Sequence, residues 1–381
     1  MHRLLVCAPR LVSGEVWWVQ CSRFVGLDVH DATTSICMRD RDGRILHETV
    51  IPTTTAALRR YFRLHRGRIA VTFEEGTLAG WLYQILHEQV ALLIVCNPRH
   101  NRLLNVGSKS DRIDARKLSE LLRLGALRPV HHDAHPVEIR ELVAHYDVLV
   151  ADSIRVMVRI RSIYRANGVR VEGENAHESR PRKRWLRAMR NEVARRRLER
   201  LYRQLDAVLE LREEARLDML AAAAKYPEFA LLQTIPYVGE IRAAHLLAWV
   251  AVRHFPSRRH LWSYAGFAVV TRSSSDHDRD GRRNERPRLS RGLSRNCNPR
   301  LKRVLKDIAL GASLGRGALK AMYDAYIARG LTVQVARVAL ARRIASIVRA
   351  VLRDSHPYSE QRLPGAGSEQ EKRLLPKEVR A

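Results

Sequence analysis

The 381-residue chain has few cysteines, few acidic side chains and no long apolar run. Its cysteines are scattered and form no Cys-x-x-Cys pair; they are Cys7, Cys21, Cys37, Cys96 and Cys297. This odd number and this spacing argue against a disulfide framework or a structural zinc site, and they indicate reduced thiols in the cytoplasm. No apolar stretch approaches the roughly 18 residues of a membrane-spanning helix. We therefore expect a cytoplasmic protein with no membrane partner.

The two ends of the chain lack the features of folded or targeting segments. Pro9 and Arg10 interrupt the apolar part of the opening segment, which argues against a secretion signal. We expect residues 1–22 to form a disordered extension. The tail at 353–381 is polar and contains Pro and Gly, a composition typical of disorder.

Basic residues far outnumber acidic ones. The chain has 68 Lys and Arg against 40 Asp and Glu, which gives a net charge of +28 and a pI near 10.9. Such a surplus repels itself in a compact fold unless a polyanion neutralises it. Nucleic acid is the expected partner, because each phosphate that Arg or Lys neutralises releases a counterion and adds affinity. An anionic membrane surface fits less well, since the basic stretches lack a wide apolar face.

The first part of the chain has the pattern of an α/β domain, which we predict over residues 23–130. Short apolar runs alternate with turn signals, such as Asp42-Gly43, and with amphipathic stretches. Their β-β-β-α-β-α-β order predicts a mixed sheet. We predict strands at 24–29, 34–38, 44–50, 68–73 and 90–95, and helices at 55–65, 78–88 and 111–124.

The pattern then becomes helical. Apolar residues step by three and four over 139–163, where only Ser153 departs from the pattern, and a weaker run over 198–222 breaks at Arg212. This spacing predicts an antiparallel coiled-coil hairpin, for which a plain helical bundle is the alternative. We predict the hairpin over 131–228 and a mostly α-helical domain over 229–352.

Four acidic residues stand at positions suited to a shared metal site. Asp28 and Glu74 end predicted strands, and Asp111 and Asp114 lie three apart on one face of a predicted helix. Converging carboxylates suit Mg²⁺ or Mn²⁺, which takes oxygen ligands and can hold a phosphodiester. Each residue also has a simpler interpretation: Asp111 as a helix cap, Asp28 as a turn cap and Glu74 as an ion-pair partner of an arginine.

Four segments resemble, in their order, the DEDD transposases of the insertion sequence 110 family; they are 26–30 (GLDVH), 73–76 (FEEG), 96–99 (CNPR) and 109–115 (KSDRIDA). The resemblance covers about residues 24–350. It implies a ribonuclease-H-like domain similar to the RuvC resolvase, with Asp28, Glu74, Asp111 and Asp114 as the catalytic, metal-binding tetrad. Glu75 is an alternative to Glu74. We favour Glu74, because Glu74 directly follows the apolar strand.

The second half of the chain resembles the family's C-terminal domain, through 262–267 (WSYAGF), 273–275 (SSS) and the basic run 291–303. This resemblance implies that Ser274 is a nucleophile that forms a covalent phosphoserine link to DNA, with Ser273 and Ser275 as alternatives. The family has glycine where Ser275 stands. Without the resemblance, a serine triplet in a polar loop is typical of a solvated linker.

A turn rich in Pro and Gly at 232–239 (LQTIPYVG) precedes a predicted helix that begins at Ile241. This pattern occurs in helix-hairpin-helix DNA binders, whose backbone N–H groups can hold a phosphate. The family has glycine where Tyr237 stands, so the pattern is weaker here.

Two basic segments fit contacts with a phosphate backbone: a predicted helix that starts near 180 and includes 195–197, and the cluster at 282–303. The family resemblance implies a structured guide (bridge) RNA as a partner besides DNA. Strand exchange implies a homo-oligomer, a dimer or a tetramer, with the hairpin as its assembly surface. The predicted nucleic-acid-binding residues are Lys109, Arg182, Lys183, Arg184, Arg187, Arg195, Arg196, Arg291, Arg295, Asn298, Arg300, Lys302 and Arg303.

Together these observations predict a bacterial transposase that acts at the nucleoid, cutting and rejoining DNA by metal-assisted transesterification with an RNA guide. Two alternatives stay open on the sequence. One is a RuvC-like endonuclease that hydrolyses DNA while the serine is inert. The other is a catalytically inactive protein that only binds nucleic acid.

Overall fold

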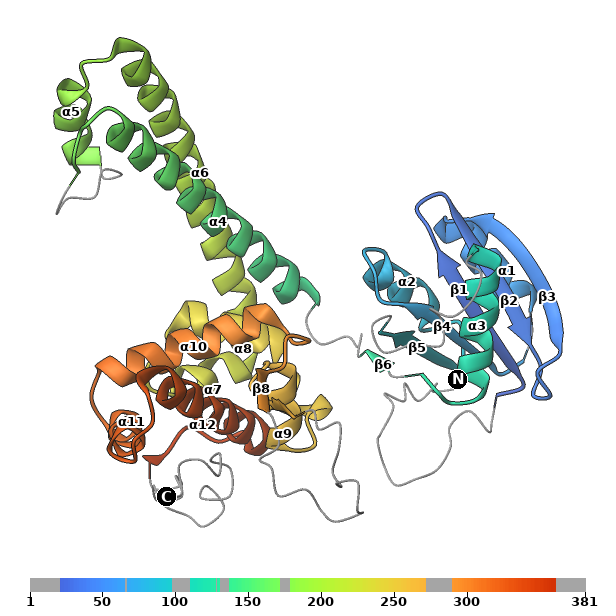
Figure 1. Cartoon of the computed structure of the whole chain (residues 1–381). Helices are drawn as coiled ribbons and strands as arrows, with labels where there is room; N and C mark the ends of the chain where they lie inside the picture. The colour runs from blue at the N-terminus through green and yellow to red at the C-terminus, as the bar shows by residue number, and fades with distance from the viewer. Residues whose placement is uncertain are drawn as a thin grey trace, which may run out of the picture. The chain divides into compact units, whose positions relative to one another are not determined.

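The computed structural model describes residues 21–65, 67–97, 110–127, 129–130, 137–171, 179–271 and 290–360. The chain divides into two compact units, residues 1–134 and 135–381, each with its own hydrophobic core (Figure 1). Within these ranges, no helix combines the length and the apolar character that a bilayer crossing requires.

The first unit is built on a six-stranded sheet of order β3-β2-β1-β4-β5-β6 in the described ranges. β1 pairs antiparallel with β2 and parallel with β4, so the sheet is mixed, as predicted. The short strand β6 is not among the predicted strands, and it pairs antiparallel with β5. The topology fits the ribonuclease-H-like fold. The strands are β1 (Arg23–Val29), β2 (Thr33–Arg39), β3 (Ile45–Pro52), β4 (Ile69–Glu74), β5 (Leu92–Cys96) and β6 (Pro129–Val130).

Helices cover the two faces of this sheet. The helices α1 (Thr55–Leu64) and α2 (Ala79–Leu86) share a core with Val25 and Leu27 of β1. Because side chains alternate along a strand, Gly26 and Asp28 face the opposite side. That side is covered by α3 (Asp111–Arg123), whose Leu118 and Leu122 are buried.

Helix α3 lies directly on β1. A methyl group added to Gly26 would overlap with the backbone of Ala115 and Ser119, and it would lie 2.9 Å from Cβ of Leu118. Only glycine therefore allows the strand and the helix to approach so closely.

A salt bridge ties α3 to strand β3. The Glu48 carboxylate accepts hydrogen bonds from Arg116 Nε and Nη2 and from Arg112 Nε and Nη2, the last at 2.6 Å. Its side chain is 11% exposed. The hydrogen bonds from Arg116 and Arg112, together with their charges, outweigh the effect of burial and hold the pKa of Glu48 at about 2. Two elements distant in sequence are thereby joined near the N-terminal end of α3.

The second unit begins with two long helices, α4 (Val137–Ala166) and α6 (Glu192–Ala224), which lie side by side with α5 (Ser179–Ala188) at one end (Figure 1). The basic stretch that we predicted as one helix is two, because α5 ends at Ala188 and a new helix begins after Asn191. The Asn191 side chain caps α6 by accepting from Ala194 N at 3.1 Å.

The two residues that break the apolar spacing of the hairpin face each other. Ser153 is fully buried between the helices, and its hydroxyl donates to Val150 O at 2.8 Å. Arg212 Nη1 donates to the same hydroxyl at 3.4 Å. The polar residue that interrupts the apolar stripe of α4 is therefore hydrogen-bonded to a polar residue of α6. The residues of the predicted stripes that are buried are Ile139, Leu149, Val156, Ile160 and Ile163 in α4 and Leu198, Leu205, Ala215, Met219 and Ala222 in α6.

The base of the hairpin shares one core with the C-terminal helices, which confirms a mostly helical second part. Ile139 and Val143 of α4 pack in this core with residues of the C-terminal helices. The elements are α7 (Pro227–Gln233), α8 (Glu240–Trp249), a 3₁₀ turn η4 (Val252–His254), α9 (Arg258–Tyr264), β7 (Val269–Thr271), β8 (Ser290–Leu293), α10 (Pro299–Leu314), α11 (Ala318–Ala328) and α12 (Val333–Asp354).

The predicted extension and tail differ from the structure where they join the folded units. Cys21 is 2% exposed and lies in the core of the first unit, although we assigned it to the extension. At the other end, Tyr358 packs against the core and its N–H donates to Thr234 Oγ1 at 2.9 Å. Residues 1–20 and 361–381 lie outside the described ranges.

Candidate active site

Two of the predicted acids end neighbouring parallel strands. In the sheet, Leu27 of β1 pairs with Phe73 of β4. Asp28 and Glu74 are the next residues along these two parallel strands, so they occupy equivalent positions. Leu27 and Phe73 both belong to the core under α1 and α2. Alternation along the strands therefore turns both Asp28 and Glu74 toward α3.

The other two acids lie in the first turn of α3. The helix is capped by Ser110, whose hydroxyl accepts from Ile113 N at 3.3 Å. The capping role is thus filled, and Asp111 is not needed as a cap. Asp111 and Asp114 still interact favourably with the positive end of the helix dipole.

His30 joins the strand acid to the helix acid. Its Nε2 lies 3.4 Å from Asp28 Oδ2 and 3.5 Å from Asp111 Oδ1. One donor atom from each of Asp28, His30 and Asp111 lies within 4.8 Å of the others. This spacing is compatible with three ligands on one metal ion.

The electrostatics of Asp28 indicate a crowded anionic site. Burial raises the pKa of Asp28, and the charges of Asp111 and Asp114 raise it further, while His30 opposes the shift. Asp28 therefore interacts with both acids of α3 even though the three-residue cluster holds only one of them. A cation at this position would relieve the repulsion.

Asp114 offers a further test of whether a metal fits. Its Oδ1 atom is buried and has no hydrogen-bond partner among the described residues. The nearest cation, Lys117 Nζ, lies 3.7 Å from it. A buried carboxylate oxygen without a hydrogen bond is costly, and a divalent cation would satisfy it. The donor set of this site therefore fits a metal ion.

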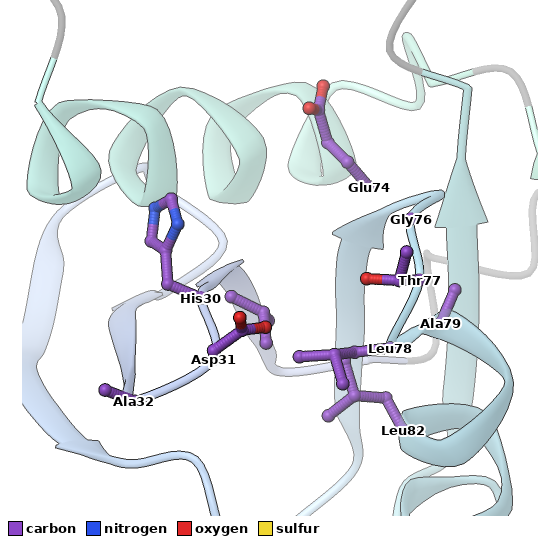
Figure 2. Close-up of a pocket in the computed structure, with 10 residues that line it drawn as sticks. His30, Asp31, Ala32, Glu74, Gly76, Thr77, Leu78, Ala79 and Leu82 are labelled. Atoms are coloured by element: carbon purple, nitrogen blue, oxygen red, sulfur yellow. The ribbon is translucent and has the colours of Figure 1, made fainter.

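Glu74 lines a cleft beside this cluster. The cleft has a volume of about 510 Å³, and its lining includes His30, Asp31, Glu74 and Thr77. Figure 2 shows the carboxylate of Glu74 and the imidazole of His30 extending to the same side, toward the helix drawn above the sheet. Glu75 is exposed and is not part of the lining. Of these two neighbouring glutamates, Glu74 is the one that lines the cleft.

His30 was absent from our set of site residues. The signal was available, because His30 stands two positions after Asp28, directly after β1 ends at Val29. The distance from His30 to Asp111 depends on how α3 packs on the sheet. This packing cannot be read from the spacing of residues in the sequence.

The predicted nucleophile lies outside the described residues. Ser274 and its neighbours Ser273 and Ser275 follow β7, which pairs antiparallel with β8 at the far side of the gap. Lys109 also lies outside the described ranges, and only the backbone of Arg291 is described.

Several predicted nucleic-acid contacts have structural partners. Asn298 caps α10: its Oδ1 accepts from the N–H groups of Arg300 and Leu301 at 3.0 Å, and its Nδ2 donates to Tyr264 Oη at 2.8 Å. In the hairpin, Arg182 binds Asp206 at 2.6 Å. Arg196 binds Glu192 at 2.8 Å, and Arg184 lies over the Trp185 ring. The other predicted contacts include the exposed residues Lys183, Arg187, Arg195 and Arg295 and the partly buried Lys302.

A charged cluster holds the hairpin base to the C-terminal helices. Asp147 of α4 accepts from Arg303, from His245 Nε2 at 3.2 Å, and lies 3.9 Å from Arg300 Nε. Its side chain is 10% exposed. Burial opposes ionisation, but His245 and Arg303 outweigh it and lower the pKa of Asp147. Arg303 is therefore committed, at least in part, to an internal ion pair.

The turn before α8 uses Tyr237 as a structural residue. Its φ of 67° lies in the left-handed region that favours glycine, which matches the glycine of the family at this position. The Tyr237 hydroxyl donates to Arg316 O at 2.6 Å and accepts from Arg316 N at 2.7 Å. The side chain thus stabilises a strained backbone through contacts with the loop after α10.

A mixed sheet with two acids at its strand ends, faced by a helix that carries two more, defines an acid-lined ribonuclease-H-like domain. Comparison with protein families agrees with this class. Residues 25–166 match the DEDD model of insertion sequence 110 transposases, described as "Transposase", and residues 229–324 match the "Transposase IS116/IS110/IS902 family". The chain belongs to the insertion sequence 110 family of transposases.

One curated relative shares part of this sequence. The "Insertion element IS110 uncharacterized 43.6 kDa protein" of Streptomyces coelicolor is 35% identical over 163 residues. The match covers 42% of this chain and 37% of that protein. The chain therefore matches little more than a third of the length of this relative.

Proposed function

We propose that the protein is a DNA transposase that cuts and rejoins DNA for a mobile element. Family membership supports the reaction class. The observation that carries the chemistry is the convergence of Asp28, His30 and Asp111 within 4.8 Å on one side of the sheet. The net charge of +28 supports a polyanionic substrate.

The residues that would hold a divalent cation, Mg²⁺ or Mn²⁺, are Asp28, Asp111, Asp114 and Glu74, with His30 beside them. When bound, such an ion polarises the scissile phosphate and stabilises charge on its oxygens. The chain's own contribution is positional, because strand ends and a helix start are rigid supports. The cleft next to Glu74 leaves room for a substrate group beside the acids.

We further propose that Ser274 is the nucleophile. Its hydroxyl oxygen would bond to phosphorus as the bond from phosphorus to one deoxyribose oxygen breaks, and the hydroxyl proton would pass by way of a base to that departing oxygen. The resulting phosphoserine link keeps the phosphodiester energy for rejoining. Resemblance to the family supports this assignment, with Ser273 and Ser275 as neighbouring alternatives.

A structured guide RNA and a homo-oligomer complete the proposal. Delegating sequence choice to RNA would leave the protein to recognise backbone and shape, which its excess of arginine suits. Strand exchange needs several active sites, so a dimer or tetramer is expected. A DNA substrate implies action at the nucleoid in the bacterial cytoplasm.

The deciding experiment incubates the full chain with Mg²⁺, cognate RNA and junction DNA, followed by a denaturing gel. A covalent protein–DNA adduct is expected for the wild type and should be lost in Ser274→Ala and in Asp28→Asn. Nicking at full rate by Ser274→Ala, with no adduct in the wild type, would instead indicate an endonuclease. Unchanged function in Asp28→Asn would indicate a protein that only binds nucleic acid.

A further inference from the structure

The distal part of the hairpin is a small folded body of its own. Residues of α4, α5 and α6 form a separate core there, which includes Ile160, Tyr164, Trp185, Leu198 and Tyr202. The hydroxyls of Tyr164 and Tyr202 are hydrogen-bonded at 3.0 Å inside it. A dedicated core supports a defined surface, so side chains on this end are held in fixed positions.

A cleft of about 370 Å³ opens on this body, and three of its six lining residues are arginines. Arg161 and Arg165 lie one helical turn apart on α4, so they share a face. The chain then reverses at Gly168, whose φ is +73°, and Val169 N donates to Tyr164 O at 3.0 Å. This reversal carries Arg170 back to the cleft that the other two arginines line.

None of these three guanidinium groups forms an ion pair with a described residue, and all three side chains are exposed. Three acids of the described part of the hairpin pair with other arginines: Asp152 binds Arg155, Asp206 binds Arg182 and Glu192 binds Arg196. Over 152–206 the sequence has sixteen Lys and Arg against seven Asp and Glu, and three of these acids, Glu172, Glu174 and Glu178, lie outside the described residues. Three like charges around one cleft repel one another unless an anion enters it.

We propose that Arg161, Arg165 and Arg170 form a phosphate-binding site for the backbone of a nucleic acid at the end of the hairpin. Planar guanidinium groups bind phosphate oxygens through paired hydrogen bonds, and three of them can hold adjacent phosphates. The volume of the cleft falls within the range of ligand pockets. The inference rests on the proposed function only in its choice of nucleic acid as the anion.

The test uses the full chain and fluorescence anisotropy, with a labelled hairpin RNA and a labelled DNA duplex of equal length over a salt series. The variant replaces all three arginines with glutamine (R161Q, R165Q and R170Q). The matched control replaces three exposed arginines of α4 and α6 that do not line the cleft and are not among the predicted contacts (R159Q, R200Q and R203Q). Because both variants lose three charges from the same hairpin, only the position of the charge differs.

The cleft variant should bind the nucleic acid that occupies the site about tenfold or more weakly than the wild type. The slope of the logarithm of the association constant against the logarithm of the salt concentration should decrease in magnitude by about 2–3. The control should retain most of the affinity. Loss with the RNA alone would identify RNA as the occupant, and loss with the duplex alone would identify DNA. Equal losses in the two variants, or no loss in the cleft variant, would overturn the proposal.

The outcome is separable from that of the proposed function. Adduct formation, which depends on Asp28 and Ser274, reports on the chemistry. If the adduct forms in the wild type while the cleft variant binds both ligands normally, the phosphate site is wrong and the transposase proposal stands. Circular dichroism melting of both variants checks that the hairpin remains folded.

Discussion

Gly26 of β1 lies against the backbone of Ala115 of α3, with no room for a methyl group between them. From Gly26 to Asp28 the strand advances two residues, roughly 6–7 Å, and from Ala115 back to Asp111 the helix covers one turn, about 6 Å. The two distances match. Contact at Gly26 therefore sets the register that places Asp111 beside Asp28.

Gly26→Ala should push α3 away from the sheet and weaken metal binding as well as stability. Overpacking of this kind costs about 1–3 kcal/mol. Urea unfolding gives the stability change, and calorimetric titration with Mn²⁺ gives the affinity. Gly80→Ala is the matched control, since nothing lies within 4 Å of the added methyl group in α2, and it should be neutral or stabilising by up to about 1 kcal/mol. Normal Mn²⁺ affinity in Gly26→Ala would contradict this role.

Asp28→Asn should make the metal-free protein more stable and abolish its response to metal. The substitution removes a buried charge that Asp111 and Asp114 repel. In the wild type, metal at about a hundred times its Kd should add about 2.7 kcal/mol. Thermal melting with and without Mn²⁺ measures both effects.

Asp31→Asn is the control for this experiment, because Asp31 lines the cleft but is not in the cluster. Its metal-induced shift should equal that of the wild type. A wild-type protein whose melting temperature ignores Mn²⁺ would remove the basis for a metal site.

Glu48→Gln should cost about 1–2 kcal/mol at pH 7, a modest value because Arg112 and Arg116 are 67% and 39% exposed. The pKa of Glu48 is lowered from 4.5 to about 2, so its stabilising effect is complete above pH 4.5 and is lost as the pH falls toward 2. Urea midpoints of the wild type and the variant should therefore converge over this range. A difference that stays constant from pH 7 to 2.5 would exclude the proposed ion pair.

Asp147→Asn should destabilise the second unit by about 1–2 kcal/mol, a modest value because Arg303 and Arg300 are 53% and 39% exposed. Both ring nitrogens of His245 lie beside oxygens, Nδ1 at 2.7 Å from Ile241 O and Nε2 at 3.2 Å from Asp147 Oδ1. The neutral asparagine would leave the guanidinium of Arg303 without its counter-charge. Denaturant unfolding measures the effect. Asp152→Asn in the same helix, where the ion pair is exposed, should change stability by less than about 1 kcal/mol.

Much of the fold followed from local pattern. Alternating apolar residues and turn signals predicted the mixed sheet, and a three-four spacing predicted the long helices that carry Ser153 and Arg212. The position of β6 was missed because two residues hold too little pattern. The break at Asn191 was missed because arginines fit a helix on either side of it.

The sequence by itself determined which acids end strands and begin a helix, since those positions depend on neighbours within a few residues. Only the tertiary structure decided that His30 lies between Asp28 and Asp111, that Arg303 is neutralised by Asp147, and that Arg170 returns to Arg161. The physical reason is range. Local propensity acts over one or two helical turns. These contacts depend instead on how close two packed elements come to each other, as β1 and α3 do at Gly26.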